Sequence, residues 1–402
     1  MAALFSALAP GVSAQQPLSL VEADQRGQFI YQQSAVTGMV LVVVRGNESM
    51  IKTYGETAPA SNRNPDAHSE VRLCSVSKIL TTDLLARLVA NGTVKLDDPL
   101  QLYAPRRKGV PTFALAQPIR LRNLATHTAG LPREVSSYPR NTPHFTFPDY
   151  QFRWTWLQTQ KPKTAPGTAA LYSNIGFDLL GDALASSTHQ SYAQLLHDSL
   201  LQPLNMWDTT LVPSADQCAR LLVGSRDEGP CTDTQPSGPS GGVYSTPADM
   251  LKLLQYLLHV PGSPTQPAGA LDIYLKPDQL KSVEGLNHAG DATGIGLGWI
   301  QLGDPATPPQ SSRRPAAAPA SAPTSPSFPS ARPASLSPSP KATATPKSTS
   351  TPKSTTSSPP SPTSHPSRPA STNPTPSNTT PKPIAPIKPP QPYDRPADSL
   401  TS

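Results

Sequence analysis

The hydrophobic pattern of residues 37–59 predicts two β-strands joined by a tight turn. Met39–Val44 is a continuous apolar run, and the tetrapeptide RGNE at positions 45–48 separates it from a second strand-like segment. An apolar run without polar positions is typical of a strand that is buried on both faces. We therefore expect a hairpin whose first strand lies inside a larger sheet.

The chain from residue 74 to residue 259 carries hydrophobic side chains at helical spacing. Segment 74–92 ends in Asn91-Gly92, a common helix stop, and segments 174–188 and 191–204 are also amphipathic. Segment 245–259 has Thr246 as N-cap and Pro247 at the first helical position. The sequence thus predicts a helix-rich middle without internal repeats. Because two strands do not form a stable sheet alone, and no obvious long strand lies between residues 60 and 290, the hairpin needs partners from elsewhere.

The last 99 residues differ in composition from the rest. Residues 304–402 contain 27 of the 51 prolines and no glycine. Such a segment cannot bury enough apolar surface to offset its chain entropy, so we expect it to be disordered. It holds ten Lys/Arg against three Asp/Glu (+7), so residues 1–303 carry about −1 of the formal net charge of +6. The basic character belongs to this tail and is spread too thinly to indicate nucleic-acid binding.

The N-terminus has features of an export signal. An apolar stretch precedes Val12-Ser13-Ala14, a small-x-small pattern that a signal peptidase cuts, although a positively charged start is missing. We expect residues 1–14 to be a signal peptide that is shortened at its start, the alternative being a frayed terminal segment. No run of 18 apolar residues predicts a transmembrane helix.

Three cysteines are present, and two of them are close in sequence. Cys218 and Cys231 flank a loop rich in Gly and Asp, and they are either a disulfide or two free thiols. The export signal favours the disulfide. No group of residues has metal-ligand spacing, so we expect neither a metal nor another cofactor.

Two short motifs could carry chemistry. Ser75 and Lys78 form a Ser-x-x-Lys at the start of a helix, where residues i and i+3 share a face and the amine can reach the hydroxyl. Tyr172 and Asn174 open the helix at 174–188, where a phenol can relay a proton and an amide can hold a carbonyl. Each motif alone is as readily explained by an N-cap serine, a surface lysine, a packed tyrosine or a capping asparagine.

Together with their flanks these motifs resemble the penicillin-recognising serine enzymes. Segments such as LATHTAGLPRE, YSNIGFDLLGDALA and PSGGVYSTPADM are similar to the AmpH-type D-alanyl-D-alanine carboxypeptidase/endopeptidases, over about residues 15–300. The resemblance implies an α/β (α+β) fold of the serine β-lactamase and penicillin-binding-protein class, with an antiparallel sheet flanked by helices and an all-helical subdomain. It further implies that Ser75 is acylated, that Lys78 and Tyr172 share the proton transfers, and that Asn174 contacts the acyl amide.

The same resemblance implies an exported, periplasmic hydrolase. Its partners would be peptidoglycan stem peptides and β-lactams, with no nucleic acid; peripheral association with a membrane stays open. Cys218 and Cys231 also resemble cysteines of this subgroup. Other conspicuous residues receive no catalytic role: His127 and Cys74 are expected to be packed, Ser77 to lie on another helical face, and Ser240-Gly241-Gly242 to form a turn.

One motif of the family is absent from the sequence. The resemblance places Lys-Thr-Gly on a strand after Gly296–Trp299, but the last glycine is Gly303 and the Lys-Ser-Thr triplets at 347–349 and 353–355 lack the glycine. In the family, that strand supplies one oxyanion-hole N–H donor and, with the strands that follow it, completes the sheet. We therefore expect an incomplete hydrolase domain at 15–303, with its C-terminal strands missing and its activity impaired, followed by the tail at 304–402.

Three explanations compete. The chain is a serine D,D-peptidase by descent whose C-terminal part was replaced, for instance by a frameshift; or an inactive peptidoglycan-binding remnant with a proline-rich tail; or a class C-type β-lactamase or related esterase with a different third element.

Overall fold

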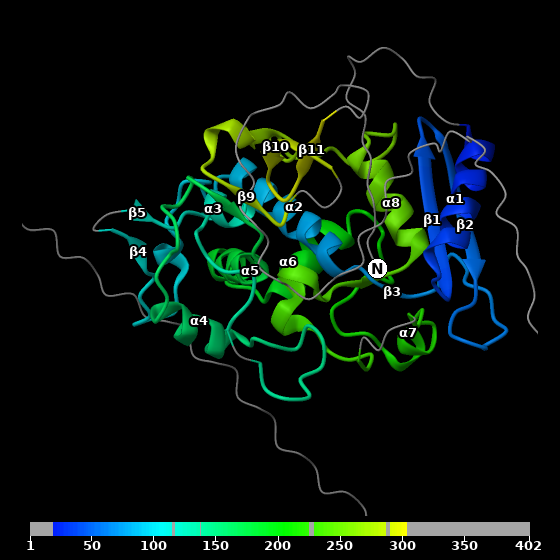
Figure 1. Ribbon diagram of the computed structural model, residues 1–402, viewed down its shortest axis with the longest axis horizontal. Coiled ribbons are helices and arrows are strands. Elements are labelled where there is room, and N and C mark those ends of the chain that lie inside the picture. The colour runs from blue at the N-terminus through cyan, green and yellow to red at the C-terminus, as the bar shows by residue number, and fades with distance from the viewer. Residues whose placement is uncertain (1–18, 115–116, 137, 225–228, 287–289, 304–402) are drawn as a thin grey trace, which may run out of the picture. The chain divides into compact units, whose positions relative to one another are not determined.

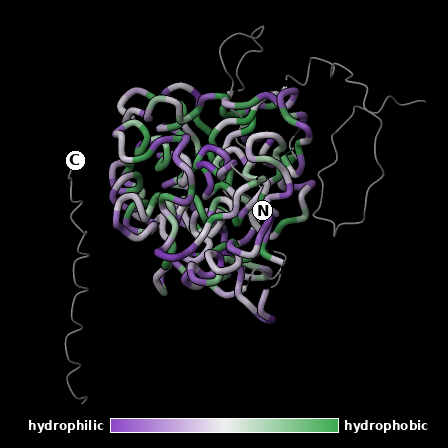
Figure 2. Tube along the Cα trace, turned by 90° about the vertical axis from the view of Figure 1, so that its left-hand side faces the viewer, coloured by the Kyte–Doolittle hydropathy of each residue, from purple (hydrophilic) through white to green (hydrophobic). Residues whose placement is uncertain are grey.

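The computed structural model describes residues 19–114, 117–136, 138–224, 229–286 and 290–303, which all belong to one compact unit (Figure 1). The signal peptide predicted at 1–14 and the disordered tail predicted at 304–402 lie outside the described residues. Hydrophobic and hydrophilic stretches alternate along the described trace (Figure 2).

Helices and short strands alternate through this unit. The helices are α1 (Leu20–Ser34), α2 (Ser77–Ala90), α3 (Leu121–Ala125), α4 (Tyr150–Gln158), α5 (Asn174–Thr188), α6 (Tyr192–Leu196), α7 (Ala215–Ala219) and α8 (Pro247–Leu257). The strands are β1 (Gly38–Arg45), β2 (Glu48–Gly55), β3 (Val71–Arg72), β4 (Thr112–Phe113), β5 (Gln117–Pro118), β6 (Ala170–Leu171), β7 (Tyr244–Ser245), β8 (Ile273–Leu275), β9 (Val283–Glu284), β10 (Ala292–Gly296) and β11 (Ile300–Leu302).

The predicted N-terminal hairpin is confirmed. β1 and β2 pair antiparallel with Arg45 opposite Glu48, and Gly46 adopts φ +55°, as the first central residue of a two-residue hairpin turn requires. Helices α1 and α8 pack against this hairpin (Figure 1). The expectation that β1 is buried on both faces is wrong, since every β1 residue is only half-buried. Within the described residues β1 pairs with β2 alone, so one of its edges has no neighbouring strand.

The core lies among the helices, with α2 and α5 at its centre. Leu80, Leu84 and Leu85 of α2 and Phe177 of α5 are completely buried. Polar α2 residues are buried as well, because α5, α6 and the turn formed by Gly238–Gly242 (the 238–242 turn) surround the helix. The helix-rich middle predicted from the spacing is therefore the part of the molecule that holds the largest apolar core.

The C-terminal end of the described chain forms a small antiparallel sheet in the order β11-β10-β8. Gly298, just after β10, contacts both α3 and α2: its N–H donates to the Ala125 carbonyl of α3 at 2.9 Å, and a Cβ there would come within 3.0 Å of Thr82 Oγ1 on α2. The close approach explains why this position, with φ +72°, is a glycine. In the described part of the chain, no helix has the length and apolar composition needed to cross a bilayer.

Candidate active site

Ser75 lies at the junction between β3 and α2. The chain enters through Leu73, whose N–H donates to the Val243 carbonyl at 2.9 Å, and Cys74 then takes a left-handed conformation with φ +48°. A non-glycine residue in this region costs about 1 kcal/mol or more, which the surrounding packing must offset. The single helical turn Cys74–Val76 follows, and α2 begins at Ser77. Ser75 is thus presented at a helix start, as the sequence predicts.

Lys78 lies one turn further along α2 and is 3% exposed. Its Nζ donates to Asn174 Oδ1 at 2.6 Å, to the Ser240 carbonyl at 2.5 Å and, more loosely, to Ser75 Oγ at 3.4 Å. The three N–H groups of an ammonium are therefore matched by three acceptors. The Nζ also lies 4.8 Å from the centroid of the Tyr172 ring.

Tyr172 and Asn174 come from the junction between β6 and α5. Ser173 is the N-cap: its Oγ accepts from Gly176 N at 3.0 Å and donates to the Pro132 carbonyl at 2.7 Å. This cap fixes the residues on either side of it. The Tyr172 hydroxyl donates to Ser75 Oγ at 2.5 Å, while the Asn174 side chain bonds Lys78.

The structure therefore brings the four residues that the sequence singled out into one hydrogen-bonded cluster. Ser75 and Lys78 come from the start of α2, and Tyr172 and Asn174 come from the start of α5. Tyr172 is 97 positions from Ser75 in the sequence, and Asn174 is 96 positions from Lys78. A hydroxyl that contacts both a phenol and an amine has two groups available to take and return its proton. This arrangement is suited to nucleophilic catalysis by Ser75.

Several groups that hold this cluster have no role in the prediction from sequence. Glu134 accepts a hydrogen bond from Asn174 Nδ2 and another from the Tyr138 hydroxyl, at 3.0 Å. Ser77, expected to have no part, accepts from Val243 N at 3.2 Å. The serine-glycine segment, expected to be only a turn, supplies the Ser240 carbonyl that binds Lys78. Glu134 is the last residue of the quoted segment LATHTAGLPRE, but no spacing rule relates it to Asn174.

His127 is packed behind the cluster, as expected. Its ring stacks on Tyr172 with centroids 4.6 Å apart and lies 4.8 Å from the centroid of Phe177, and its Nδ1 accepts from Ser173 N at 3.0 Å. Burial, with the positive charges of Lys78 and Arg133 nearby, holds the pKa of His127 well below its ordinary value. The imidazole is therefore neutral and helps to orient the turn that carries Tyr172.

Asp178 is a second buried titratable group beside the cluster. It is 2% exposed, and its Oδ1 accepts from Ser240 N at 3.2 Å. Burial raises the pKa of Asp178 to about 7, against the opposing effects of Arg153, the Ser240 hydrogen bond and Lys78. The carboxyl group thus titrates near neutral pH.

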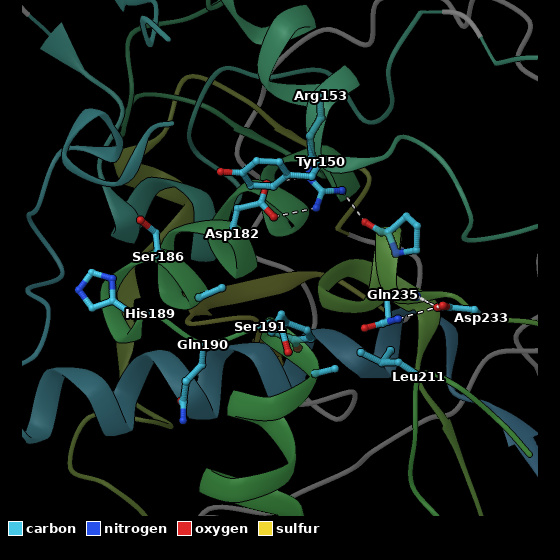
Figure 3. A pocket seen from close by; sticks show the side chains of 14 residues that line it. Tyr150, Arg153, Asp182, Ser186, His189, Gln190, Ser191, Leu211, Asp233 and Gln235 are labelled. Atoms are coloured by element: carbon cyan, nitrogen blue, oxygen red, sulfur yellow. Dashed lines mark hydrogen bonds and ion pairs between the residues drawn. The ribbon is translucent and has the colours of Figure 1, made fainter. Parts of the chain in front are cut away.

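A cavity of about 600 Å³ lies elsewhere, beside the second half of α5 (Figure 3). Tyr150, Arg153, Asp182 and His189 are among the residues that line it, and none of the four clustered residues does. The Arg153 guanidinium is already held by Asp182, with Nε to Oδ2 and Nη2 to Oδ1 both at 2.7 Å. Two charged side chains that line this cavity, Arg153 and Asp182, therefore bond each other.

Cys218 and Cys231 form a disulfide in the structure. The loop that it closes lies next to the strand that precedes Ser75: Arg72 Nη2 donates to the Gly229 carbonyl at 2.9 Å and to the Pro230 carbonyl at 2.8 Å. The covalent link therefore restrains a loop that supports the approach to the nucleophile position.

The chain is similar in sequence to several known proteins. The family model described as beta-lactamase matches residues 21–317. The D-alanyl-D-alanine-carboxypeptidase/endopeptidase AmpH of Escherichia coli strain K12 is 42% identical over 308 residues, which cover 75% of this chain and 80% of that protein. The human protein named putative beta-lactamase-like 1 is 32% identical over 66% of this chain and 53% of its own length.

Solved structures give the same likeness in three dimensions. The beta-lactamase/D-alanine carboxypeptidase of Yersinia pestis, crystallised with citrate, superimposes with a TM-score of 0.67 at 40% identity and covers 69% of this chain and 80% of its own. A class C beta-lactamase of Rhodobacter sphaeroides superimposes with a TM-score of 0.51 at 27% identity, covering 62% and 68% of the two chains.

Proposed function

Because this chain belongs to the β-lactamase family and has the fold and serine hydrolase character of that family, we propose that it is a serine D,D-carboxypeptidase/endopeptidase acting on peptidoglycan stem peptides. The observation that carries the proposal is the position of Ser75 Oγ, 2.5 Å from the Tyr172 hydroxyl and 3.4 Å from Lys78 Nζ. The likeness to a D-alanyl-D-alanine-carboxypeptidase/endopeptidase supports the substrate class.

In the proposed reaction, Ser75 Oγ attacks the carbonyl carbon of the D-Ala-D-Ala peptide bond. Its proton passes to the Tyr172–Lys78 pair, which then protonates the departing amine as the C–N bond breaks. An ester to Ser75 remains, and water hydrolyses it with proton transfers through the same pair. In this proposal Asn174, whose side chain bonds Lys78 and Glu134, contacts the acyl amide. A β-lactam would acylate Ser75 in the same way, since opening its ring replaces departure of the amine.

We further propose that this activity is impaired. No lysine-threonine-glycine triplet follows Trp299, so the strand that supplies the family's second oxyanion-hole donor has no counterpart in this sequence. Loss of one such donor slows acyl transfer by about 10²–10³-fold. The domain boundaries 15–303 and the separate tail 304–402 belong to the same proposal.

The reaction is assigned to the periplasm, after export. The Cys218–Cys231 disulfide supports this location, because disulfides persist in oxidising compartments.

Labelling with a fluorescent penicillin tests the proposal. We expect slow covalent labelling of the full chain, mapped by peptide mass spectrometry to Ser75, and slow release of D-alanine from a D-Ala-D-Ala peptide. Ser75→Ala should abolish both, whereas Ser186→Ala, at the cavity beside α5, should leave both unchanged. Labelling that persists in Ser75→Ala would refute the role of Ser75. Rapid turnover of a chromogenic cephalosporin would instead indicate a β-lactamase.

A further inference from the structure

We propose that Asp178 is a positioning residue of this site: it holds the Ser240 backbone that binds Lys78, and its carboxylate balances the charge of the Lys78 ammonium. The inference rests on the proposed function, in which Lys78 carries the proton of Ser75. Asp178 itself contacts neither Ser75 nor the place of the substrate, so it acts through Ser240 and Lys78.

The two hydrogen bonds of Ser240 link Asp178 to Lys78. Ser240 N donates to Asp178 Oδ1 at 3.2 Å, and the carbonyl of the same residue accepts from Lys78 Nζ at 2.5 Å. The side chains of Asp178 and Lys78 are almost completely buried, at 2% and 3% exposure respectively. A buried peptide N–H bonded to a carboxylate makes a directional contact, so the Ser240 carbonyl is held where it accepts from the Lys78 amine.

The peptide bond before Ser240 is held at both ends. Its N–H is bound by Asp178 on α5, and its oxygen, that of Pro239, accepts from Thr81 Oγ1 on α2 at 2.8 Å. The Thr81 hydroxyl is also 2.6 Å from that of Tyr192. The 238–242 turn is therefore clamped between the two helices that carry the clustered residues. Without Asp178 only the α2 side of the clamp would remain.

The distribution of charge assigns the Asp178 carboxylate to Lys78. The titratable groups that face Asp178 come from several elements, namely Lys78 on α2, Arg153 on α4, Asp182 on α5, Tyr192 on α6, and Tyr138 in the loop before α4. Of the two cations, Arg153 has the larger effect on Asp178, but its guanidinium already makes a two-pronged ion pair with Asp182. Glu134 is separated from Lys78 by the Asn174 amide that both contact. Asp178 is therefore the buried carboxylate that we assign to balance Lys78.

Competitive labelling with acetic anhydride tests the charge balance without any catalytic assay. Mass spectrometry compares the acetylation of Lys78 with that of the exposed Lys161 in the same sample. In Asp178→Asn the amide oxygen can still accept from Ser240 N, but the negative charge is lost. The uncharged, reactive form of the Lys78 amine is then favoured, so at a fixed pH the acetylation of Lys78 relative to Lys161 should rise about tenfold. The matched control is Asp83→Asn, because Asp83 is a buried carboxylate on α2 that is bonded to Arg87 and Tyr256, and this change should leave the Lys78 to Lys161 ratio unaltered. An unchanged ratio in Asp178→Asn would overturn the charge balance.

The rate at which fluorescent penicillin labels Ser75 tests the positioning role. This rate is measured from pH 5 to pH 9 and expressed per folded molecule. Asp178→Asn should lose an inflection near pH 7 that the parent chain shows, because the titrating group is gone. Asp178→Ala loses the acceptor as well and should label about 10–100-fold more slowly than Asp178→Asn. Equal rates and a retained inflection would refute the positioning role. If the parent chain does not label with penicillin at all, the proposed function fails, while the acetylation ratios still decide whether Asp178 balances Lys78.

Discussion

At the scale of single residues, Glu70 is the least satisfied group in the described part of the chain. It is completely buried, and neither of its carboxyl oxygens has a hydrogen-bond partner. Arg220 Nη2 lies 4.0 Å from Oε2, which is too long for a hydrogen bond. Burial therefore dominates over this weak attraction and raises the pKa of Glu70 to about 8, with the carboxylates of Asp208 and Asp249 acting in the same direction. The side chain is protonated in the folded protein at neutral pH.

We predict that Glu70→Gln is increasingly stabilising as pH rises. In the unfolded chain the glutamic acid ionises near its ordinary pKa of 4.5, whereas the folded protein keeps the proton up to about 8. The folded state then binds more protons than the unfolded state, so stability is lost between these values as pH rises. Glutamine matches the neutral acid in shape and does not ionise. Relative to the parent chain, the free energy of unfolding of Glu70→Gln should rise by about 3–4 kcal/mol between pH 5 and pH 8.5.

Urea unfolding at both pH values measures this difference. The exposed residue Glu284 provides the control, since Glu284→Gln should give the same small difference at both pH values. A difference for Glu70→Gln that does not change with pH would show that the buried carboxyl finds partners in solution.

At the scale of elements, the close fit of α5 against the 238–242 turn fixes the site. Gly181 of α5 faces Pro239, and a Cβ at Gly181 would lie 2.1 Å from Pro239 Cγ and 2.6 Å from Pro239 Cβ. Both neighbours belong to a rigid ring on a buried turn, so neither can move away without shifting the backbone. The glycine therefore lets the turn approach closely enough for Ser240 to bond both Asp178 and Lys78.

Gly181→Ala should destabilise the protein although alanine is the better helix former. The overlap with Pro239 resembles overpacking of a core, which costs about 1–3 kcal/mol, and it exceeds the gain in helix propensity of about 1 kcal/mol. The same displacement of the turn should weaken penicillin labelling of Ser75. Thermal or urea unfolding measures the first effect. Gly109→Ala is the matched control, because no atom lies within 4 Å of the added Cβ. Equal stability of the two variants would contradict the overlap.

The sequence predicted these elements better than the contacts between them. Helical periodicity found α2, α5 and α8, and Ser75, Lys78, Tyr172 and Asn174 were singled out because their motifs depend on local spacing. Glu134 and the Ser240 carbonyl could not be found in this way, since they meet Asn174 and Lys78 only after distant segments pack together. The burial of β1 was overestimated for a related reason: an apolar run indicates what a strand could bury, not whether a second partner is present.

At the scale of the whole described unit, stability is distributed unevenly. The helices around α2 and α5 hold the large apolar core, whereas β1 is half-buried along its length and pairs with β2 alone among the described strands. An apolar edge strand without a neighbour is open to water and to pairing with other chains. Regions with fewer buried contacts open at lower free energy than the core. The hairpin should therefore be the part of this unit that opens first.

Residue-resolved hydrogen exchange of β1 makes this expectation testable. Hydrogen-bonded and non-bonded pairs alternate in an antiparallel ladder, and the pair flanking a two-residue turn, here Arg45 and Glu48, is a bonded one. The amides of Leu41 and Val43 then point to β2, and those of Val40, Val42 and Val44 point to the free edge. We expect the second group to exchange at least about tenfold faster than the first, and both to exchange faster than the amides of Leu84 and Leu85 in α2. The α2 amides are the internal control for global unfolding.

Equal protection of all five β1 amides would mean that another strand covers this edge, and the domain would then be more complete than we propose.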